Sequence, residues 1–176
     1  ASRIDVPIIL YNIPGRTAVT IAPETIARLH EDHANIVAVK HATGSIDDAS
    51  QLSTLSDIAI LSGDDTLTLP LIGIGAVGVI SVIGNLLPKE VSAMVSAALS
   101  GDLNAARAGH RRLFPVAREM LMLDTNPIPI KTALAMENRM AEEFRLPMCS
   151  MDAEKRQRLK SIIKTVRSAQ ATRQFA

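Results

Sequence analysis

The chain has very few aromatic residues, one cysteine and almost no excess of charge. Aromatic residues make up 2% of its 176 positions and tryptophan is absent, so the core must be built from Ile, Val, Leu, Ala and Met. The lone Cys149 excludes an internal disulfide, which fits a reducing compartment. A formal net charge of +1 and the lack of a basic tract argue against a nucleic-acid partner. What remains is the composition of an ordinary globular protein.

An uninterrupted hydrophobic run that could cross a membrane is also missing. Residues 66–88 carry no charged side chain and have the length of a membrane span. However, Pro70, Asn85 and four glycines interrupt them, and we interpret the segment as a short helix, a glycine turn and a buried strand. The first residues lack the apolar core of a signal peptide. We therefore expect no membrane partner.

Four short apolar runs have the composition of strands that are buried on both faces. They are rich in Val and Ile and do not alternate with polar residues, as is typical of parallel strands covered on both sides. These runs are residues 6–11, 36–40, 58–61 and 77–82. Helical patterns lie between them, so the order predicts a parallel α/β sheet with right-handed crossovers.

The helical patterns carry start signals. Pro23 suits a first helical turn, and Ser45 followed by Asp48 resembles a capping box. Asp64 and Asp65 could form an acid–base pair, but we favour one of them as a cap for a helix over residues 66–72. After residue 88 the alternation stops and only helical patterns follow, up to a tail that we expect to fray from Gln170. Their apolar faces lie at 91–99, 103–117, 130–134 and 159–166, with a break at 101–102 and a rigid "NPIPIK" link at 126–131.

Two motifs suggest ligands but do not have the required context. "GIGAVG" (residues 73–78) matches a dinucleotide fingerprint, which needs a strand before it and a helix after it. The predicted order here is reversed, so we interpret these glycines as a tightly packed turn. "HEDH" (residues 30–33) lies at a predicted helix end, where its side chains would be solvated, and has no third metal ligand at useful spacing. The sequence therefore predicts neither a cofactor nor a metal.

The ends of the predicted strands hold the most reactive residues. In parallel α/β proteins, chemistry collects where strands stop, and these ends place Tyr11 and Lys40 on neighbouring strands. An apolar surround would lower the pKa of the lysine, so that its amine could form an imine with a ketone while the phenol moves protons. A second interpretation stays open, in which Lys40 snorkels out of the sheet and Tyr11 fills a gap.

Five ordered motifs resemble those of the dihydrodipicolinate synthase family, within the pyruvate-dependent aldolase superfamily that includes N-acetylneuraminate lyase. The motifs are "YNIPGRT" (11–17), "VAVKHATG" (37–44), "LSGDD" (61–65), "GVISVIGN" (78–85) and "NPIPIKTAL" (126–134). The resemblance implies a (β/α)8 barrel of the TIM type that condenses pyruvate with aspartate semialdehyde, without a cofactor, in lysine and diaminopimelate biosynthesis. It also implies a cytoplasmic homotetramer.

The resemblance assigns roles to particular residues. Lys40 would be the Schiff-base lysine and Tyr11 part of the proton relay, while Arg16 would hold the carboxylate of the second substrate. The remaining substrate-binding positions would be Thr43 and Gly44 in the turn beside the lysine, and Gly63 and Ile80 in the pyruvate pocket. His41 departs from the family, which usually has an acid after the lysine.

A larger departure is the length of the chain. A barrel of this type takes ~250 residues, whereas this chain starts without Met and supplies only four strands over residues 1–88 and a helical region over 89–176. It also lacks the family's Thr-Thr pair, its second Tyr and most residues that bind feedback lysine. We expect a fragment, the C-terminal half of a barrel, that folds poorly or associates through its open sheet edges. Two alternatives are a sister lyase acting on another aldehyde and a non-catalytic remnant.

Overall fold

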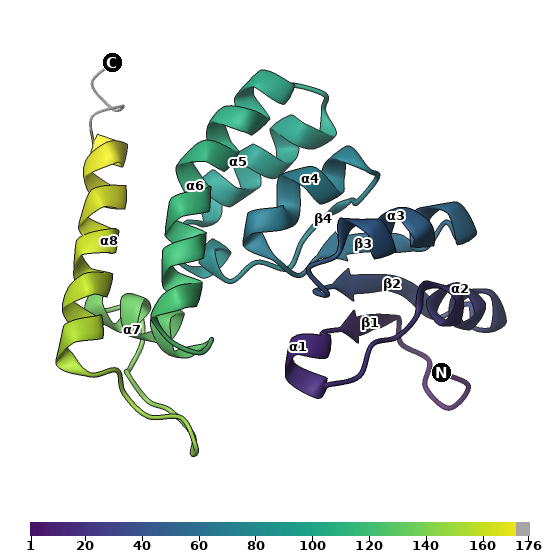
Figure 1. Ribbon diagram of the computed structural model, residues 1–176, viewed down its shortest axis with the longest axis horizontal. Coiled ribbons are helices and arrows are strands. Elements are labelled where there is room, and N and C mark those ends of the chain that lie inside the picture. The colour runs from purple at the N-terminus through teal and green to yellow at the C-terminus, as the bar shows by residue number, and fades with distance from the viewer. Residues whose placement is uncertain (172–176) are drawn as a thin grey trace. The chain divides into compact units, whose positions relative to one another are not determined.

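The structure is a computed structural model that describes residues 1–171, and it contains two compact units (Figure 1). Unit 1 comprises Ala1–Ser81 and Ala93–Ala108, and unit 2 comprises Val82–Ser92 and Gly109–Ala176. Two long helices, α5 (Pro88–Leu99) and α6 (Leu103–Leu123), contribute residues to both units. The division predicted after residue 88 stays a prediction.

Unit 1 is built on a four-stranded parallel sheet in the order β1-β2-β3-β4. The strands are β1 (Ile8–Asn12), β2 (Ile36–His41), β3 (Ala59–Ser62) and β4 (Gly78–Val79). All four predicted strands are confirmed, although β4 is much shorter than residues 77–82. Its partner β3 ends at Ser62, which pairs with Val79, so no neighbouring strand is left to extend the ladder. Among the described residues, β1 and β4 are the two edges of the sheet.

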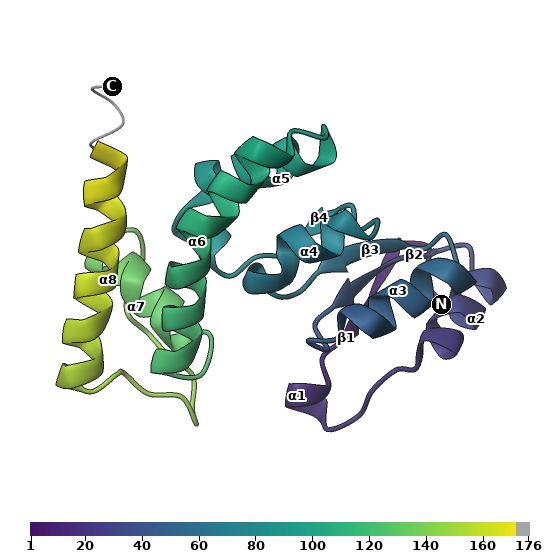
Figure 2. The ribbon, with the colours of Figure 1, turned by 45° about the horizontal axis from the view of Figure 1, so that its top comes forward.

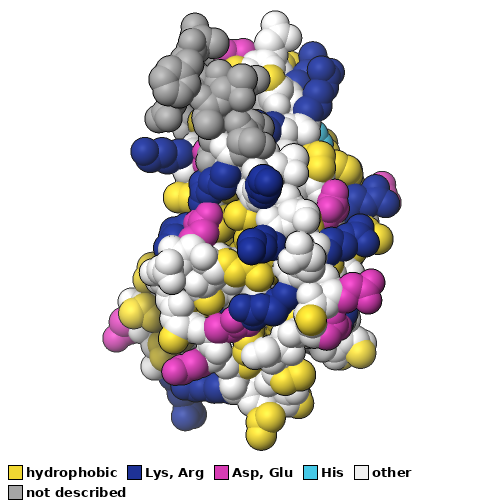
Figure 3. Space-filling view, turned by 90° about the vertical axis from the view of Figure 1, so that its left-hand side faces the viewer, with side chains coloured by type: hydrophobic (Ala, Val, Ile, Leu, Met, Phe, Trp, Pro, Cys, Tyr) yellow, Lys and Arg dark blue, Asp and Glu magenta, His cyan; other side chains and the backbone are white. Residues whose placement is uncertain are grey.

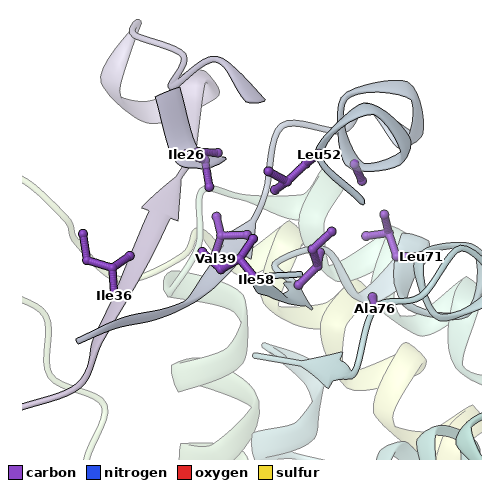
Figure 4. Close-up of a cluster of buried hydrophobic side chains, with 9 residues drawn as sticks. Ile26, Ile36, Val39, Leu52, Ile58, Leu71 and Ala76 are labelled. Atoms are coloured by element: carbon purple, nitrogen blue, oxygen red, sulfur yellow. The ribbon is translucent and has the colours of Figure 1, made fainter. Parts of the chain in front are cut away.

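The helices that connect these strands are α1 (Pro14–Thr17), α2 (Pro23–Asp32), α3 (Ile46–Leu55), η1 (Asp65–Leu67) and α4 (Thr68–Gly73). Of these, α2, α3 and α4 cover one face of the sheet, as Figure 2 shows. Apolar side chains from α2, α3 and α4 meet those of β2 and β3 in a single buried cluster (Figure 4). Its members are Ile26, Ile36, Val39, Ala49, Leu52, Ile58, Ile60, Leu71 and Ala76.

The start signals of these helices are confirmed in part. Pro23 opens α2, and the Ser45 hydroxyl accepts a hydrogen bond from the Asp48 N–H at 3.0 Å, as in the predicted capping box. Of the two aspartates predicted as a cap, Asp64 occupies the N-cap position of η1, but its side chain makes no cap hydrogen bond there. The Asp65 carboxylate instead accepts a hydrogen bond from the Ser81 hydroxyl, near the end of β4.

The "GIGAVG" and "HEDH" motifs lie where the sequence predicts them, in a turn between a helix and a strand and at the end of a helix. The "GIGAVG" run joins α4 to β4, as predicted, but tight packing does not explain its first two glycines, because a Cβ added to Gly73 or Gly75 would meet nothing within 4 Å. Gly75 instead has a φ of +107°, a conformation that L side chains rarely adopt. His30 is less solvated than expected. Its Nδ1 lies 2.6 Å from the Ile36 carbonyl oxygen and its Nε2 lies 3.2 Å from Asp57. Both contacts fix the end of α2 against the sheet.

Unit 2 is helical. It holds η2 (Ile83–Asn85), most of α6, α7 (Ile128–Met136) and α8 (Ala153–Ala171). The predicted helices are confirmed, and Gly101, with a φ of +84°, separates α5 from α6 as expected. Helix α7 begins two residues before the predicted Ile130, inside the "NPIPIK" link. Helix α8 continues to Ala171, and the rest of the tail expected to fray lies outside the described residues. No helix among residues 1–171 is long and apolar enough to span a membrane.

Candidate functional site

The predicted reactive pair lies on one row across the sheet. Strand register pairs Tyr11 with Lys40, Lys40 with Leu61, and Leu61 with Gly78. Because side chains alternate between the two faces of a strand, this row points away from the face covered by the helices. Tyr11 is 47% exposed and Lys40 is partly exposed, so the described residues do not complete the dry surround that we expect around the amine.

Lys40 and Tyr11 are in direct contact. The Lys40 Nζ lies 3.8 Å from the centroid of the Tyr11 ring, which is the geometry of a cation–π interaction. The face of the ring, not its hydroxyl, therefore meets the amine. Lys131, the lysine of the "NPIPIK" motif, is engaged elsewhere: its amine donates to the Glu143 carbonyl oxygen and lies 5.1 Å from the centroid of the Phe144 ring.

A buried asparagine fixes the segment that follows Tyr11. Asn12 is 2% exposed, and its side chain accepts from the Ile21 N–H at 3.1 Å and donates to the Ile21 carbonyl oxygen at 2.9 Å. These two bonds close the loop that carries α1, where Pro14 occupies the first helical turn. Arg16 lies on α1, on a different element from the lysine, and is exposed.

The turn after Lys40 is closed by hydrogen bonds to one histidine. His41 is 2% exposed, and its Nε2 lies 2.8 Å from the Ser45 carbonyl oxygen and 2.9 Å from the Thr43 hydroxyl oxygen. The same hydroxyl oxygen accepts from the Ser45 N–H at 3.1 Å. Gly44 has a φ of +77°, a conformation that L side chains rarely adopt. The turn therefore depends on a glycine at this position.

The segment after β3 packs directly against this turn. The Gly63 N–H donates to the His41 carbonyl oxygen at 2.7 Å, and a Cβ added to Gly63 would lie 2.5 Å from the Ala42 Cβ. Only glycine allows so close an approach. The structure thus brings Gly63 next to the turn that holds Thr43 and Gly44.

Asp64 adds a half-buried carboxyl group at the same end of the sheet. Burial raises the pKa of this carboxyl above its ordinary value, because the charged form loses solvation. Asp65 also raises the pKa, whereas His41, the Gly44 N–H and Lys40 lower it. These contributions place the Asp64 carboxyl near the turn that follows Lys40.

Ile80 follows β4 directly and is 40% exposed. Its N–H donates to the Ser62 carbonyl oxygen at 2.8 Å, which keeps it beside the end of β3. Of the predicted site residues, Tyr11 and Lys40 are in contact with each other, and Thr43 and Gly63 each form a hydrogen bond with His41. Among residues 1–171, no group of three or more His, Cys, Asp or Glu side chains is arranged to hold a metal ion.

A family model described as the dihydrodipicolinate synthetase family matches residues 1–166. The chain belongs to this family. It is 48% identical over 164 residues to the 4-hydroxy-tetrahydrodipicolinate synthase of Methanocaldococcus jannaschii, covering 93% of this chain and 56% of that protein. It is also 45% identical to the same enzyme of Geobacter sulfurreducens, with 93% and 57% covered. The chain therefore spans little more than half the length of the curated relatives that it matches.

Solved structures from the dihydrodipicolinate synthetase family share the fold. The chain matches the dihydrodipicolinate synthase of Aquifex aeolicus with a TM-score of 0.90 and 42% identity, covering 93% of this chain and 56% of that one. The 4-hydroxy-tetrahydrodipicolinate synthase of Methylacidiphilum fumariolicum SolV gives a TM-score of 0.90 and 46% identity, with 94% and 56% covered. The four parallel strands and their helices are therefore the C-terminal half of a TIM barrel, as predicted.

Sequence reasoning missed two members of the site. His41 was noted only as a departure from the family, and Asp64 only as a possible acid or cap. The signal for both was their position, directly after a strand end that carries a reactive residue. The pairing of strands β2 and β3, which places these two side chains together, could not be read from their separate motifs.

Proposed function

We propose that this chain is part of a 4-hydroxy-tetrahydrodipicolinate synthase in which Lys40 forms a Schiff base with pyruvate. The observation that carries the proposal is the position of Lys40 at the carboxyl end of a central strand, in contact with Tyr11. Relatives at 44–48% identity bear that enzyme's name, which supports the assignment over a sister lyase. Because the chain spans about half of their length, the activity is proposed for a protein that includes the missing strands.

The chemistry follows from an uncharged amine. The Lys40 nitrogen attacks the keto carbon of pyruvate, and water leaves as the imine forms. The imine withdraws electrons, so a methyl proton is lost and an enamine results. The enamine carbon then bonds to the aldehyde carbon of aspartate semialdehyde, whose own amine displaces Lys40 as the ring closes. We assign to the Tyr11 hydroxyl the movement of protons during these steps.

The other predicted residues would bind and orient the substrates. Arg16 suits a carboxylate because its guanidinium can donate two parallel hydrogen bonds, and we assign it to aspartate semialdehyde. Thr43, Gly44, Gly63 and Ile80 would form the part of the pyruvate pocket that this chain supplies. The same proposal places the protein in lysine and diaminopimelate biosynthesis, as a cytoplasmic homo-oligomer that uses no cofactor.

Borohydride reduction in the presence of pyruvate, followed by peptide mass mapping, tests the assignment of the lysine in a protein that includes the missing strands. We expect a reduced pyruvate adduct on Lys40 and none in Lys40→Arg, which keeps the charge but is a poor nucleophile. Lys131 is an internal control, since its amine is already hydrogen-bonded. An adduct on Lys131 or another lysine, or no adduct on Lys40, would overturn the proposal.

Arg16→Ala separates this reaction from that of a sister lyase. The substitution removes the proposed carboxylate contact while leaving Lys40 in place. We expect Lys40 to trap pyruvate as before and the use of aspartate semialdehyde to fall by about tenfold or more, as for the loss of a hydrogen bond to a charged group. Equal losses of pyruvate trapping and of aspartate semialdehyde use would contradict the role assigned to Arg16. Arg16→Lys tests whether a positive charge alone is sufficient.

A further inference from the structure

A cleft of about 640 Å³ lies between the end of α7 and one side of α8. Every residue that lines it belongs to unit 2, and its volume is within the usual range for sites that bind small molecules. Figure 3 shows Lys and Arg side chains, with hydrophobic ones between them, on the face that α8 contributes. The lining residues that decide the chemistry of the cleft are Met136, Glu137, Arg156, Lys160, Ile163 and Lys164.

The acidic groups at the cleft are already matched by arginines. Glu137 accepts two hydrogen bonds of 2.7 Å from Arg167, and the Arg139 Nη1 lies 3.7 Å from the same carboxylate. Arg156 forms an ion pair with Glu142. These pairs fix the charged side chains at the edge of the cleft and largely cancel one another, so they leave no excess of negative charge there.

Two lysines remain in the cleft without such a match. Lys160 and Lys164 are exposed and lie four residues apart on the same side of α8, about 6 Å apart along the helix axis. Among residues 1–171, neither lysine takes part in an ion pair. Like charges at this spacing destabilise a helix. A bound anion would relieve that repulsion.

The same cleft has an apolar lining. Met136, the last residue of α7, and Ile163 of α8 are only partly buried and line it from two sides. Ile163 directly precedes Lys164 in the chain and follows Lys160 by three residues, so it lies on the same side of the helix. A small inorganic anion bound to the lysines would leave this apolar surface in water. A ligand with an aliphatic body would cover it.

We propose that this cleft binds an organic dicarboxylate, with one carboxylate on each of Lys160 and Lys164 and a short aliphatic body against Met136 and Ile163. The carboxylates lie on the α8 side in this arrangement, because the end of α7 carries the partial negative charge of a helix C-terminus. The site is separate from the proposed Schiff-base chemistry, since none of its residues has a role in that reaction.

Titration calorimetry of the full chain at low salt tests the class of ligand, with adipate as the probe. We expect adipate to bind saturably and hexanoate, which lacks the second carboxylate, to bind about fivefold more weakly. The shorter succinate covers less apolar surface, and its dissociation constant should also be about fivefold higher. Raising the NaCl concentration to about 1 M should weaken adipate binding, because salt screens exposed charges.

Variants of α8 locate the site. Lys160→Gln and Lys164→Gln should each raise the dissociation constant of adipate about fivefold and bring it close to that of hexanoate. Ile163→Thr keeps the branched shape but should weaken both ligands. Arg158→Gln is the matched control, because Arg158 is an exposed cation of the same helix that lines a different hollow, and it should change binding by less than about twofold.

Several results would reject the site. They are no saturable adipate binding, equal binding of adipate and hexanoate, inorganic phosphate binding as tightly as adipate, or an equal loss in Arg158→Gln. Sedimentation that shows self-association of the chain, abolished by Lys160→Gln, would assign the cleft to a second copy instead. Ellipticity checks that each variant is folded. Amide chemical shifts of the natural chain provide a second measurement, and adipate-induced changes outside residues 136–137 and 153–164 would also contradict the proposal.

Discussion

The two units of the chain differ in the contacts that stabilise them. Unit 1 buries Ile, Val and Leu on one face of its sheet and leaves large apolar or aromatic side chains open on the other. These are Ile9, Tyr11 and Ile80, which are 40–47% exposed. Unit 2 buries apolar side chains such as Leu159 between its helices and adds charged pairs, in which Arg167 donates to Glu137 through two hydrogen bonds of 2.7 Å. The described residues therefore leave one face of the unit 1 sheet uncovered, and unit 2 also exposes some apolar side chains, such as Met122 and Leu146.

The two units also differ in the sign of their net charge. Asp and Glu outnumber Lys and Arg in unit 1, and the reverse holds in unit 2. Figure 3 shows Lys and Arg side chains along the face that α8 contributes. The open row of the sheet is what a closed barrel would bury, and it supports the prediction that this chain associates or requires further strands. That prediction is not yet tested.

The largest expected effects on stability come from substitutions in the hydrophobic cores of the two units. Leu52 in unit 1 and Leu159 in unit 2 are 1% and 0% exposed, so truncation of either to Ala should lower the free energy of unfolding by about 2–5 kcal/mol. Urea unfolding, followed by ellipticity and by fluorescence of the single tyrosine in unit 1, measures both. Leu55→Ala and Leu121→Ala, at half-exposed positions, should change the free energy of unfolding by about 0.5 kcal/mol or less. Equal effects in core and control variants would contradict this division of burial.

Close backbone packing near the site distinguishes unit 1 further. Gly63→Ala would place a Cβ 2.5 Å from that of Ala42, and we expect it to lower the free energy of unfolding by about 1–3 kcal/mol. Gly73→Ala is the matched control, since its added Cβ meets nothing within 4 Å at the end of α4. The midpoint of thermal unfolding should be clearly lower for Gly63→Ala and unchanged for Gly73→Ala. A tolerated Ala at position 63 would mean that the two segments are not held together.

Unit 2 should lose stability in acid. The pKa of the Glu142 carboxyl lies below its ordinary value of 4.5, chiefly because Arg156 donates to it, with a further hydrogen bond from Thr132. Its contribution is therefore complete above pH 4.5 and is lost as the pH falls through the lowered pKa. Glu142→Gln should reduce the free energy of unfolding by up to about 1 kcal/mol at pH 7 and by less below pH 4. A pH-independent difference would exclude the ion pair as its cause.

Asp64 in unit 1 should contribute more to stability in acid than at neutral pH, and its effect on the free energy of unfolding should be the smallest. Its pKa is raised from 3.8, so the folded chain binds its proton more tightly than the unfolded chain does. Its contribution to stability is therefore most favourable at or below pH 3.8 and is lost as the pH rises through the raised pKa. Asp64→Asn should make the chain slightly more stable than the natural one at pH 7 and equal to it in acid. Urea midpoints across this pH range measure the difference, and a loss at pH 7 would show that the charge itself is required.

Local features of the chain could be predicted where they depend on neighbours in sequence. Pro23 and Ser45 start helices as expected, because a fixed φ and a side-chain acceptor act within one turn. The length of β4 could not be predicted, since it depends on where β3 ends. The surroundings of Asp64 could not be predicted for a similar reason: a cap is a local choice, but His41 and Lys40, whose charges lower the pKa of its carboxyl, belong to another strand.

The sequence by itself determined the four strands, the helices that follow them and the position of Lys40 at a strand end. Apolar composition, turn residues and spacing are sufficient for these, since each depends on a few adjacent residues. Only the tertiary structure decided that Lys40 meets the ring of Tyr11, and that the Gly63 N–H binds the His41 carbonyl oxygen. Those contacts join separate strands and loops, and parallel pairing brings them together only when the register of the whole sheet is set.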